Sequence, residues 1–239
     1  MQVIKHTYKD VVLRVRAESD YCAWRGKTMF TKEPETIRWL ERMSENDVLW
    51  DIGANIGLYS LFASRVSKVG CVYAFEPDSQ NFLELNWNKY INAANTIIPY
   101  CIGIGEAPKL GQLFLSHFEP GRSGHSIRST RSPQHTQGCV IESIDSLIEK
   151  GLKMPTHVKI DIDGLEPQVV AGMEKNITSI HSILIELNNK IPEHVALIEK
   201  IKSYGFWFNQ AQVDRTNREE GSGWENYHEY IFWNMEYYS

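Results

Sequence analysis

Short, almost wholly apolar runs alternate with longer amphipathic stretches from about residue 36 to residue 205, and this alternation constrains the fold more than any other feature of the sequence. The apolar runs begin near Val48, Cys71, Thr96, His157 and Ser182. A strand that is apolar on both faces needs helices on both faces, as in parallel sheets. The sequence therefore predicts a doubly wound α/β fold with a mostly parallel sheet.

Two segments depart from this alternation. Residues 109–116 carry an alternating apolar pattern, which predicts an additional strand rather than a crossover helix. Residues 116–138 are rich in Ser, Gly, Arg and His and almost lack apolar side chains. Compact domains seldom contain a structureless segment of this length unless it closes a site, binds a ligand or is disordered. We therefore predict a long binding loop at residues 116–138.

No linker or change of composition divides the chain, so residues 1–239 are predicted to form one domain. Residues 1–35 contain one alternating run, and we expect them to be an extension that packs against this domain. The aromatic C-terminal part predicts a final pair of strands at residues 206–208 and 230–233. Both end segments are candidate contacts for a homodimer.

The charges and cysteines narrow the range of partners. The chain has 25 Lys and Arg residues against 30 Asp and Glu, a formal net charge of −5, whereas proteins that bind duplexes need a basic face. No apolar stretch approaches the length of a membrane span or resembles a signal-peptide core. The four cysteines lack the paired spacing of a zinc site. We therefore predict a cytoplasmic protein with no nucleic-acid partner, no membrane partner and no bound metal.

The turn after the first predicted strand points to a ligand. Asp51 ends that strand, and Gly53, Asn55 and Gly57 follow it. Glycines let the backbone approach a ligand closely, and ligands of open α/β sheets bind beyond the carboxyl ends of the strands. The dinucleotide fingerprint needs a glycine where Asn55 stands, and the Asp51 carboxylate would repel a pyrophosphate but attract an ammonium or sulfonium group. A nicotinamide-dependent oxidoreductase is therefore disfavoured.

Glu76 follows the second predicted strand, 25 positions after Asp51, so both should lie at one edge of the sheet. An acidic side chain there can accept hydrogen bonds from the hydroxyls of a ribose, and Pro77 stiffens the loop. Together Asp51 and Glu76 predict a ligand with a cationic end and a ribose end. S-adenosylmethionine has this chemistry.

Five motifs in the chain, with Gly172 after the fourth, resemble those of the FkbM family of class I S-adenosylmethionine-dependent methyltransferases. They lie at residues 50–57 (WDIGANIG), 75–78 (FEPD), 144–147 (IDSL), 159–166 (KIDIDGLE) and 185–188 (IELN). The resemblance covers about residues 36–190, and the motif order matches throughout. It implies a seven-stranded sheet of the class I methyltransferase type.

The resemblance also implies where the cofactor is bound. The positions are Asp51, Gly53, Asn55 and Gly57 around its methionine part, Glu76 on the ribose, and Ile102 with Cys101 beside the adenine. By strand order, Asp161 should face the reactive methyl group. The remaining question is which residues serve the acceptor.

Methyl transfer to a hydroxyl group requires an in-line arrangement and a destination for the acceptor's proton. Asp161, Asp163 and His125 are the candidate general bases. A contact with the cofactor's amino group is an equally good interpretation of Asp161. Asp161 and Asp163 face the same side if the strand persists, although a turn at Gly164 would break this arrangement. With Asn188 these carboxylates would suit Mg²⁺, but no spacing requires it.

The long loop places Arg122, His125 and Arg128 close together in an otherwise acidic chain. Guanidinium groups pair well with carboxylates and phosphates. We therefore expect these residues to bind an anionic group of the acceptor, such as the phosphate of a nucleotide sugar. The alternative is a solvated loop without a ligand.

The sequence thus predicts an O-methyltransferase that uses S-adenosylmethionine and acts on a sugar, a nucleotide sugar or a glycan-related small molecule. One alternative is a methyltransferase whose acceptor is RNA or another natural product, although the net negative charge argues against RNA. Another alternative is a module that binds the cofactor without turnover.

Overall fold

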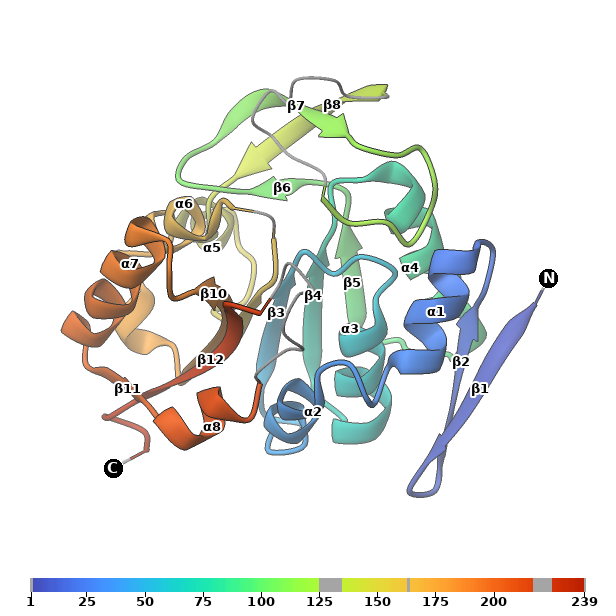
Figure 1. The fold of residues 1–239 in the computed structure, drawn as a ribbon, viewed down its shortest axis with the longest axis horizontal. Coiled ribbons are helices and arrows are strands. Elements are labelled where there is room, and N and C mark those ends of the chain that lie inside the picture. The colour runs from blue at the N-terminus through green and yellow to red at the C-terminus, as the bar shows by residue number, and fades with distance from the viewer. Residues whose placement is uncertain (1, 125–134, 163, 217–224, 239) are drawn as a thin grey trace.

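The computed structural model describes residues 2–124, 135–162, 164–216 and 225–238. In this part of the chain, a sheet of seven strands lies at the centre, with helices on both faces (Figure 1). Its strands, in sheet order, are β11 (Phe206–Phe208), β12 (Tyr227–Asn234), β10 (Ser182–Asn188), β9 (His157–Ile160), β3 (Val48–Ile52), β4 (Cys71–Phe75) and β5 (Ile97–Tyr100). Six of these strands run in the same direction, and β12 runs in the opposite direction. The predicted doubly wound, mostly parallel seven-stranded α/β sheet is therefore confirmed.

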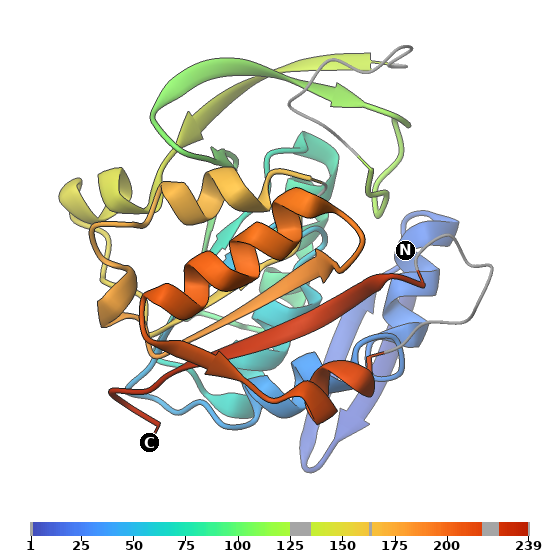
Figure 2. The ribbon, with the colours of Figure 1, turned by 60° about the vertical axis from the view of Figure 1, so that its left-hand side comes forward.

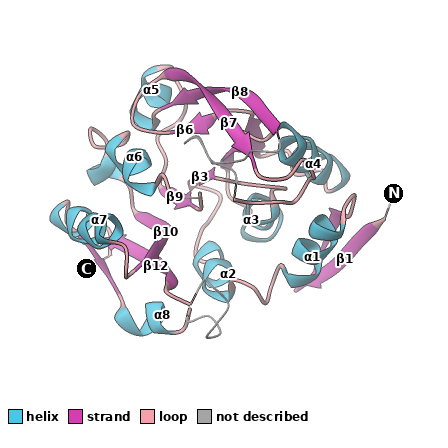
Figure 3. Cartoon of the chain, turned by 45° about the horizontal axis from the view of Figure 1, so that its top comes forward, coloured by secondary structure: helices cyan, strands magenta, loops and turns pink. Residues whose placement is uncertain are grey.

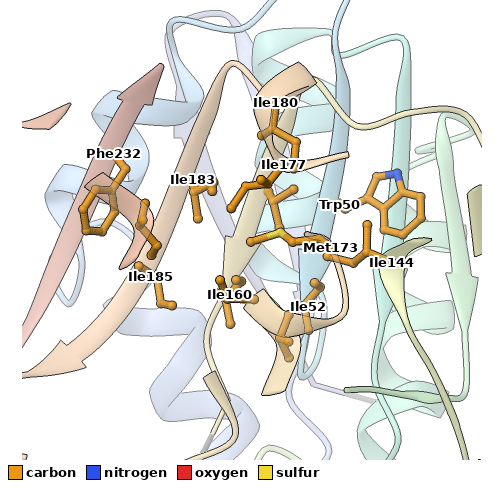
Figure 4. Packing of buried hydrophobic residues seen from close by; sticks show 14 of the residues in the cluster. Trp50, Ile52, Ile144, Ile160, Met173, Ile177, Ile180, Ile183, Ile185 and Phe232 are labelled. Carbon is orange, nitrogen blue, oxygen red and sulfur yellow. The ribbon is translucent and has the colours of Figure 1, made fainter. Parts of the chain in front are cut away.

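Alternation along the strands divides the core into two halves. One half lies under α5 (Ile144–Glu149), α6 (Glu166–Ala171), the short 3₁₀ turn Ile177–Ser179 and α7 (Pro192–Ser203), and the other under α2 (Pro34–Leu40), α3 (Leu58–Phe62), its π-helical continuation Ala63–Ser67 and α4 (Ser79–Ile91). Trp50 and Ile52 of β3 belong to the first half, and Leu49 belongs to the second. Figure 4 shows Trp50, Ile52 and Ile160 packed on the side of the sheet that carries Met173. Burial on both faces explains why the strands read as continuous apolar runs.

Two helix ends follow directly from local chemistry. Asp78 caps α4, since its side chain accepts a hydrogen bond from the backbone N–H of Gln80 at 3.0 Å. Helix α7 ends before Gly205, whose φ of +90° suits a glycine after the last turn.

The N-terminal extension is a hairpin of β1 (Val3–Tyr8) and β2 (Val11–Arg16) followed by α1 (Asp20–Thr28). Leu13 and Val15 are buried in the second half of the core. The backbone N–H groups of Arg14 and Arg16 donate to the side-chain oxygens of Asn92 and Asn88, each at 2.8 Å. These contacts hold the extension on α4, as a packing role requires.

A second, three-stranded sheet of β6 (Gly103–Ile104), β8 (His135–Glu142) and β7 (Lys109–Leu115) lies beyond one end of the main sheet (Figures 2 and 3). Strand β7 confirms the strand predicted at residues 109–116. The predicted loop at residues 116–138 is wrong at its end, because residues 135–138 pair with β7. Only Cys139 and Ile141 of β8 are buried, so its polar first half resembles a loop in sequence.

The C-terminal strands pair as predicted, with Phe206, Trp207 and Phe208 opposite Asn234, Trp233 and Phe232. They do not form a tight hairpin, since α8 (Gln210–Asp214) lies between them in sequence. Among the described residues, no helix is both long enough and apolar enough to cross a membrane.

Candidate functional site

The main cavity of the described structure opens where the carboxyl ends of β3, β4 and β9 meet the small sheet. Its open volume, which includes solvent at the mouth, is about 640 Å³. Its lining consists of Ile52, Gly53, Asn55, Phe75, Glu76, Pro77, Asn81, Ile102, Gly103, Ile104, Leu113, Arg122, Ser123, Asp161, Ile162 and Leu165. Seven of the predicted site residues therefore share one cavity: Gly53, Asn55, Glu76, Pro77, Ile102, Arg122 and Asp161.

The turn after β3 brings the backbone close to this cavity. Gly53 has a φ of +79°, and a Cβ atom placed on it would lie 2.0 Å from the backbone oxygen of Asp161. Only glycine fits there. Gly57, with a φ of +81°, is the N-cap of α3 and packs against Leu85. It shapes the turn but does not line the cavity.

Glu76 organises the turn and faces the cavity. Its Oε2 accepts a hydrogen bond from the backbone N–H of Asn55 at 2.7 Å, and its Oε1 accepts one from Asp78 at 2.9 Å. A carboxylate has about four lone-pair sites, so the same oxygens can also accept hydrogen bonds from a ligand. One side chain thus links the ends of β3 and β4 to the space where a ligand would lie.

The sequence predicts that Asp51 attracts the cationic end of the ligand, whereas the structure places Asp51 inside the core. It is fully buried and lines neither the main cavity nor a second, adjoining cavity that is lined by Lys159 and Asp161 among others. Ser60 Oγ donates a hydrogen bond to its Oδ2 at 2.6 Å, and Lys159 Nζ lies 3.8 Å from its Oδ1. Burial raises the pKa of Asp51, against the opposing effects of Lys159 and Ser60. Asp51 therefore acts on the site through Lys159.

Lys159 is the central cation of the site, and sequence reasoning assigned it no role. It lies on β9 opposite Asp51 of β3 and is 1 % exposed. Its Nζ donates to Asp161 Oδ2 at 2.9 Å and lies 5.0 Å from the centre of the Tyr59 ring. Burial opposes the charge, but Asp161 and Asp51 raise the pKa of Lys159 above its usual value. The signal was present in the sequence, since a lysine in an apolar strand needs buried partners.

Asp161 borders both cavities. Although desolvation acts the other way, Lys159 and Lys32 hold the pKa of Asp161 well below its usual range. Strand β9 ends at Ile160, so the strand alternation that would have aligned Asp161 with Asp163 does not extend to these positions. Asp163, His125 and Arg128 lie outside the described residues, and their predicted roles stay predictions.

Arg122 lies in the segment that descends from β7 onto the cavity. Its Nε donates to Glu119 at 2.9 Å, and its guanidinium carbon lies 3.4 Å from the centre of the Tyr21 ring. Its backbone oxygen accepts hydrogen bonds from the side-chain amides of Asn55 and Asn81, at 2.8 and 3.1 Å. The structure thus places Arg122 on the main cavity with its charge already paired.

One group of three potential metal ligands occurs among the described residues, at the opposite end of the sheet. Asp47, His157 and His181 bring ligand atoms within 4.8 Å of one another. His157 already contacts Asp47 at 3.3 Å and Ser182 Oγ at 2.7 Å. These contacts join the starts of β3, β9 and β10, away from the cavities.

The family model described as the methyltransferase FkbM domain matches residues 51–208 of this chain, which is more than half of its length. The chain belongs to the FkbM methyltransferase family. The match begins at Asp51 and includes the glycine turn, Glu76, Lys159 and Asp161. The resemblance seen in the motifs is therefore confirmed.

Two relatives and one solved structure are similar to this chain. The hexuronic acid methyltransferase AglP of Haloferax volcanii is 29% identical over 202 residues, covering 82% of this chain and 77% of AglP. The 31-O-demethyl-FK506 methyltransferase FkbM of Streptomyces tacrolimicus is 24% identical over 191 residues, covering 67% and 72%. The crystal structure of methyltransferase FkbM from Methylobacillus flagellatus matches with a TM-score of 0.51 at 18% identity, covering 91% of this chain and 56% of that one. The solved structure supports the fold alone.

Proposed function

We propose that this FkbM-family protein is an S-adenosylmethionine-dependent O-methyltransferase that acts on a sugar derivative. The observation that supports it best is the pair of carboxylates, Glu76 and Asp161, on one cavity that also has an apolar part. A ligand that suits this lining has hydroxyl groups, a cationic part and a flat apolar ring. A pyrophosphate-containing dinucleotide suits it poorly.

Different residues of the cavity lining suit different parts of this cofactor. Glu76 would hold the ribose, because it already stands at the end of β4 with lone pairs directed to two backbone N–H groups and to the cavity. Ile102, Ile104 and Leu113 would enclose the adenine, since they supply the apolar surface in the small sheet and directly before it. Gly53 and Asp161 would lie along the methionine part.

The sugar acceptor is proposed from the relatives. AglP is named for hexuronic acid and the Streptomyces protein for an O-methylation, so an oxygen acceptor on a sugar-like molecule is the best-supported choice. The formal net charge of −5 argues against RNA as the alternative acceptor.

When bound, the cofactor supplies the methyl group as a ready electrophile, and the chain's contribution is to hold the acceptor in line. Asp161 is kept ionised by Lys159 and Lys32, which lower its pKa. A carboxylate with a lowered pKa is a weak base. We therefore assign Asp161 to orienting cationic and hydroxyl groups at the junction of the two cavities, rather than to storing a proton between turnovers.

The test of the proposed function is calorimetric titration of the purified protein with S-adenosylhomocysteine, with NAD as the matched control ligand. We expect saturable binding of S-adenosylhomocysteine and none of NAD. Transfer of a labelled methyl group from S-adenosylmethionine to sugar acids, sugar phosphates and nucleotide sugars then tests the acceptor class. Binding without transfer to any acceptor would favour the non-catalytic module, and the reverse preference for NAD would refute the cofactor assignment.

Replacing Asp161 by Asn is expected to lower kcat by about 100-fold, because it removes a preorganised charge next to the reacting groups. Since the pKa of Asp161 is lowered, its carboxylate stays charged above its ordinary titration range near pH 4. The wild-type rate should therefore show no loss from protonation of Asp161 between pH 8 and pH 5. The measurement is kcat across this range for both proteins, and an unchanged kcat in D161N would remove Asp161 from the mechanism.

A further inference from the structure

A second cavity adjoins the first and is partly built from a segment that precedes the family match. Its lining consists of Arg25, Thr28, Met29, Lys32, Gly53, Ala54, Asn55, Ile56, Leu58, Tyr59, Lys159 and Asp161. Gly53, Asn55 and Asp161 also line the main cavity, so the two spaces meet at the turn after β3. The outer wall comes from α1 and the residues that follow it. The extension at residues 1–35 therefore does more than pack against the domain.

Three cations line the second cavity, and two of them already have acidic partners. Lys159 is held by Asp161 and faces Asp51. Lys32 forms an ion pair with the buried carboxylate of Glu33. Although burial acts against it, Glu33 and Asp161 raise the pKa of Lys32 above its usual value. Both lysines are therefore charged and largely neutralised by the protein itself.

With the described residues, Arg25 forms no such ion pair, although its charge contributes to the lowered pKa of Asp161. Its Nε donates a hydrogen bond to the backbone oxygen of Gly121 at 2.5 Å, and its guanidinium carbon lies 6.0 Å from the centre of the Trp24 ring. Within the described residues, its two terminal nitrogens have no hydrogen-bond acceptor, and no carboxylate lies within ion-pair distance of it. A half-buried guanidinium that is anchored through Nε keeps two parallel N–H donors available for a carboxylate or a phosphate.

The anchor also fixes Arg25 relative to the main cavity. The N–H of Gly121 donates to Asn81 Oδ1 at 2.7 Å, and the next residue, Arg122, accepts hydrogen bonds from Asn55 and Asn81. Asn55 and Asn81 line the main cavity. The position of the Arg25 guanidinium is therefore set by the same residues that shape the proposed cofactor site.

We propose that the second cavity holds the methyl acceptor and that Arg25 binds an anionic oxygen group on it, either a carboxylate or a phosphate. This assignment rests on the proposed function, because it places the acceptor beside the cofactor at the shared residues Gly53 and Asp161. It moves acceptor recognition from the long loop, where the sequence suggested it, to helix α1. Specificity for the anion is then a property of a segment outside the match to the family domain.

Binding to protein saturated with S-adenosylhomocysteine tests the assignment. The probes are glucuronate, glucose 6-phosphate and neutral glucose, followed by ligand-observed NMR. Four proteins are compared: wild type, Arg25→Gln, Arg25→Lys and Lys27→Gln. Gln can still donate to the oxygen of Gly121 but has no charge, and Lys keeps the charge without the planar fork. Lys27 is an exposed residue of the same helix that does not line the cavity, so its variant is the matched control.

We expect one or both anionic probes to bind wild type and K27Q, and we expect glucose to bind neither of these proteins. R25Q should bind the same anionic probe at least about tenfold more weakly than wild type does. R25K should be intermediate. Preference between glucuronate and glucose 6-phosphate distinguishes a sugar acid from a sugar phosphate. Equal binding of glucose, no binding of either anion, or unchanged binding in R25Q would overturn the assignment while S-adenosylhomocysteine still binds. Weaker binding of S-adenosylhomocysteine itself in R25Q would also overturn it, since Arg25 would then hold the carboxylate of the cofactor's methionine part. Failure of S-adenosylhomocysteine to bind wild type would instead refute the proposed function, and this assignment with it.

Discussion

Glu76→Ala is expected to lower the affinity for S-adenosylhomocysteine by about 100-fold or more, the largest single effect on cofactor binding in the chain. The substitution removes the carboxylate that we propose as the acceptor of hydrogen bonds from the ribose. It would also release the backbone N–H groups of Asn55 and Asp78, which it now holds at 2.7 and 2.9 Å. Binding and the shape of the turn are therefore lost together. Calorimetric titration measures the change in Kd.

Two further variants serve as comparisons. Glu76→Gln keeps one acceptor oxygen but presents an amide N–H₂ to a backbone donor, so it should also bind weakly. Glu106→Ala removes an exposed carboxylate on the stretch after β6, outside the cavity lining, and should bind like wild type. Affinity within threefold of wild type in E76A, with the circular dichroism spectrum unchanged, would mean that Glu76 does not hold the ribose.

The part of the site that the sequence predicts well is the part that is local in the chain. Gly53, Asn55 and Glu76 directly follow apolar strands, and the carboxyl ends of parallel strands meet at one edge of a sheet. Their shared cavity therefore follows from strand type and order alone. Asp51, two residues before Gly53, is buried in the core, and its contacts with Ser60 and Lys159 depend on how α3 and β9 pack.

Residues from distant segments could not be predicted, because their position depends on tertiary packing. Arg25 reaches the cavity because α1 packs beside the turn after β3, and its anchor Gly121 is brought there by the segment that follows β7. The sequence patterns of α1 and of the segment after β7 do not predict that the two lie side by side. Likewise, β8 could not be recognised from sequence, because its pairing with β7 involves side chains that are mostly exposed.

Replacing Lys159 by Met is expected to destabilise the fold by about 3–5 kcal/mol, the cost typical of leaving one partner of a buried ion pair unpaired. Met fills a similar volume, so the loss reports charge rather than packing. Asp51 would be left fully buried with Ser60 as its remaining partner, and Asp161 would lose its contact at 2.9 Å. Urea denaturation followed by circular dichroism measures the free energy of unfolding.

A double variant identifies which carboxylate causes the loss of stability. If the penalty arises from the buried Asp51 carboxylate, Lys159→Met combined with Asp51→Asn should recover a large part of the lost stability, since neutralising the orphaned charge removes its desolvation cost. Lys153→Met, at an exposed lysine in the loop before β9, serves as the control and should change stability by less than about 0.5 kcal/mol. A double variant as unstable as the sum of the two single variants would show that Lys159 stabilises the fold through Asp161 and Tyr59 instead.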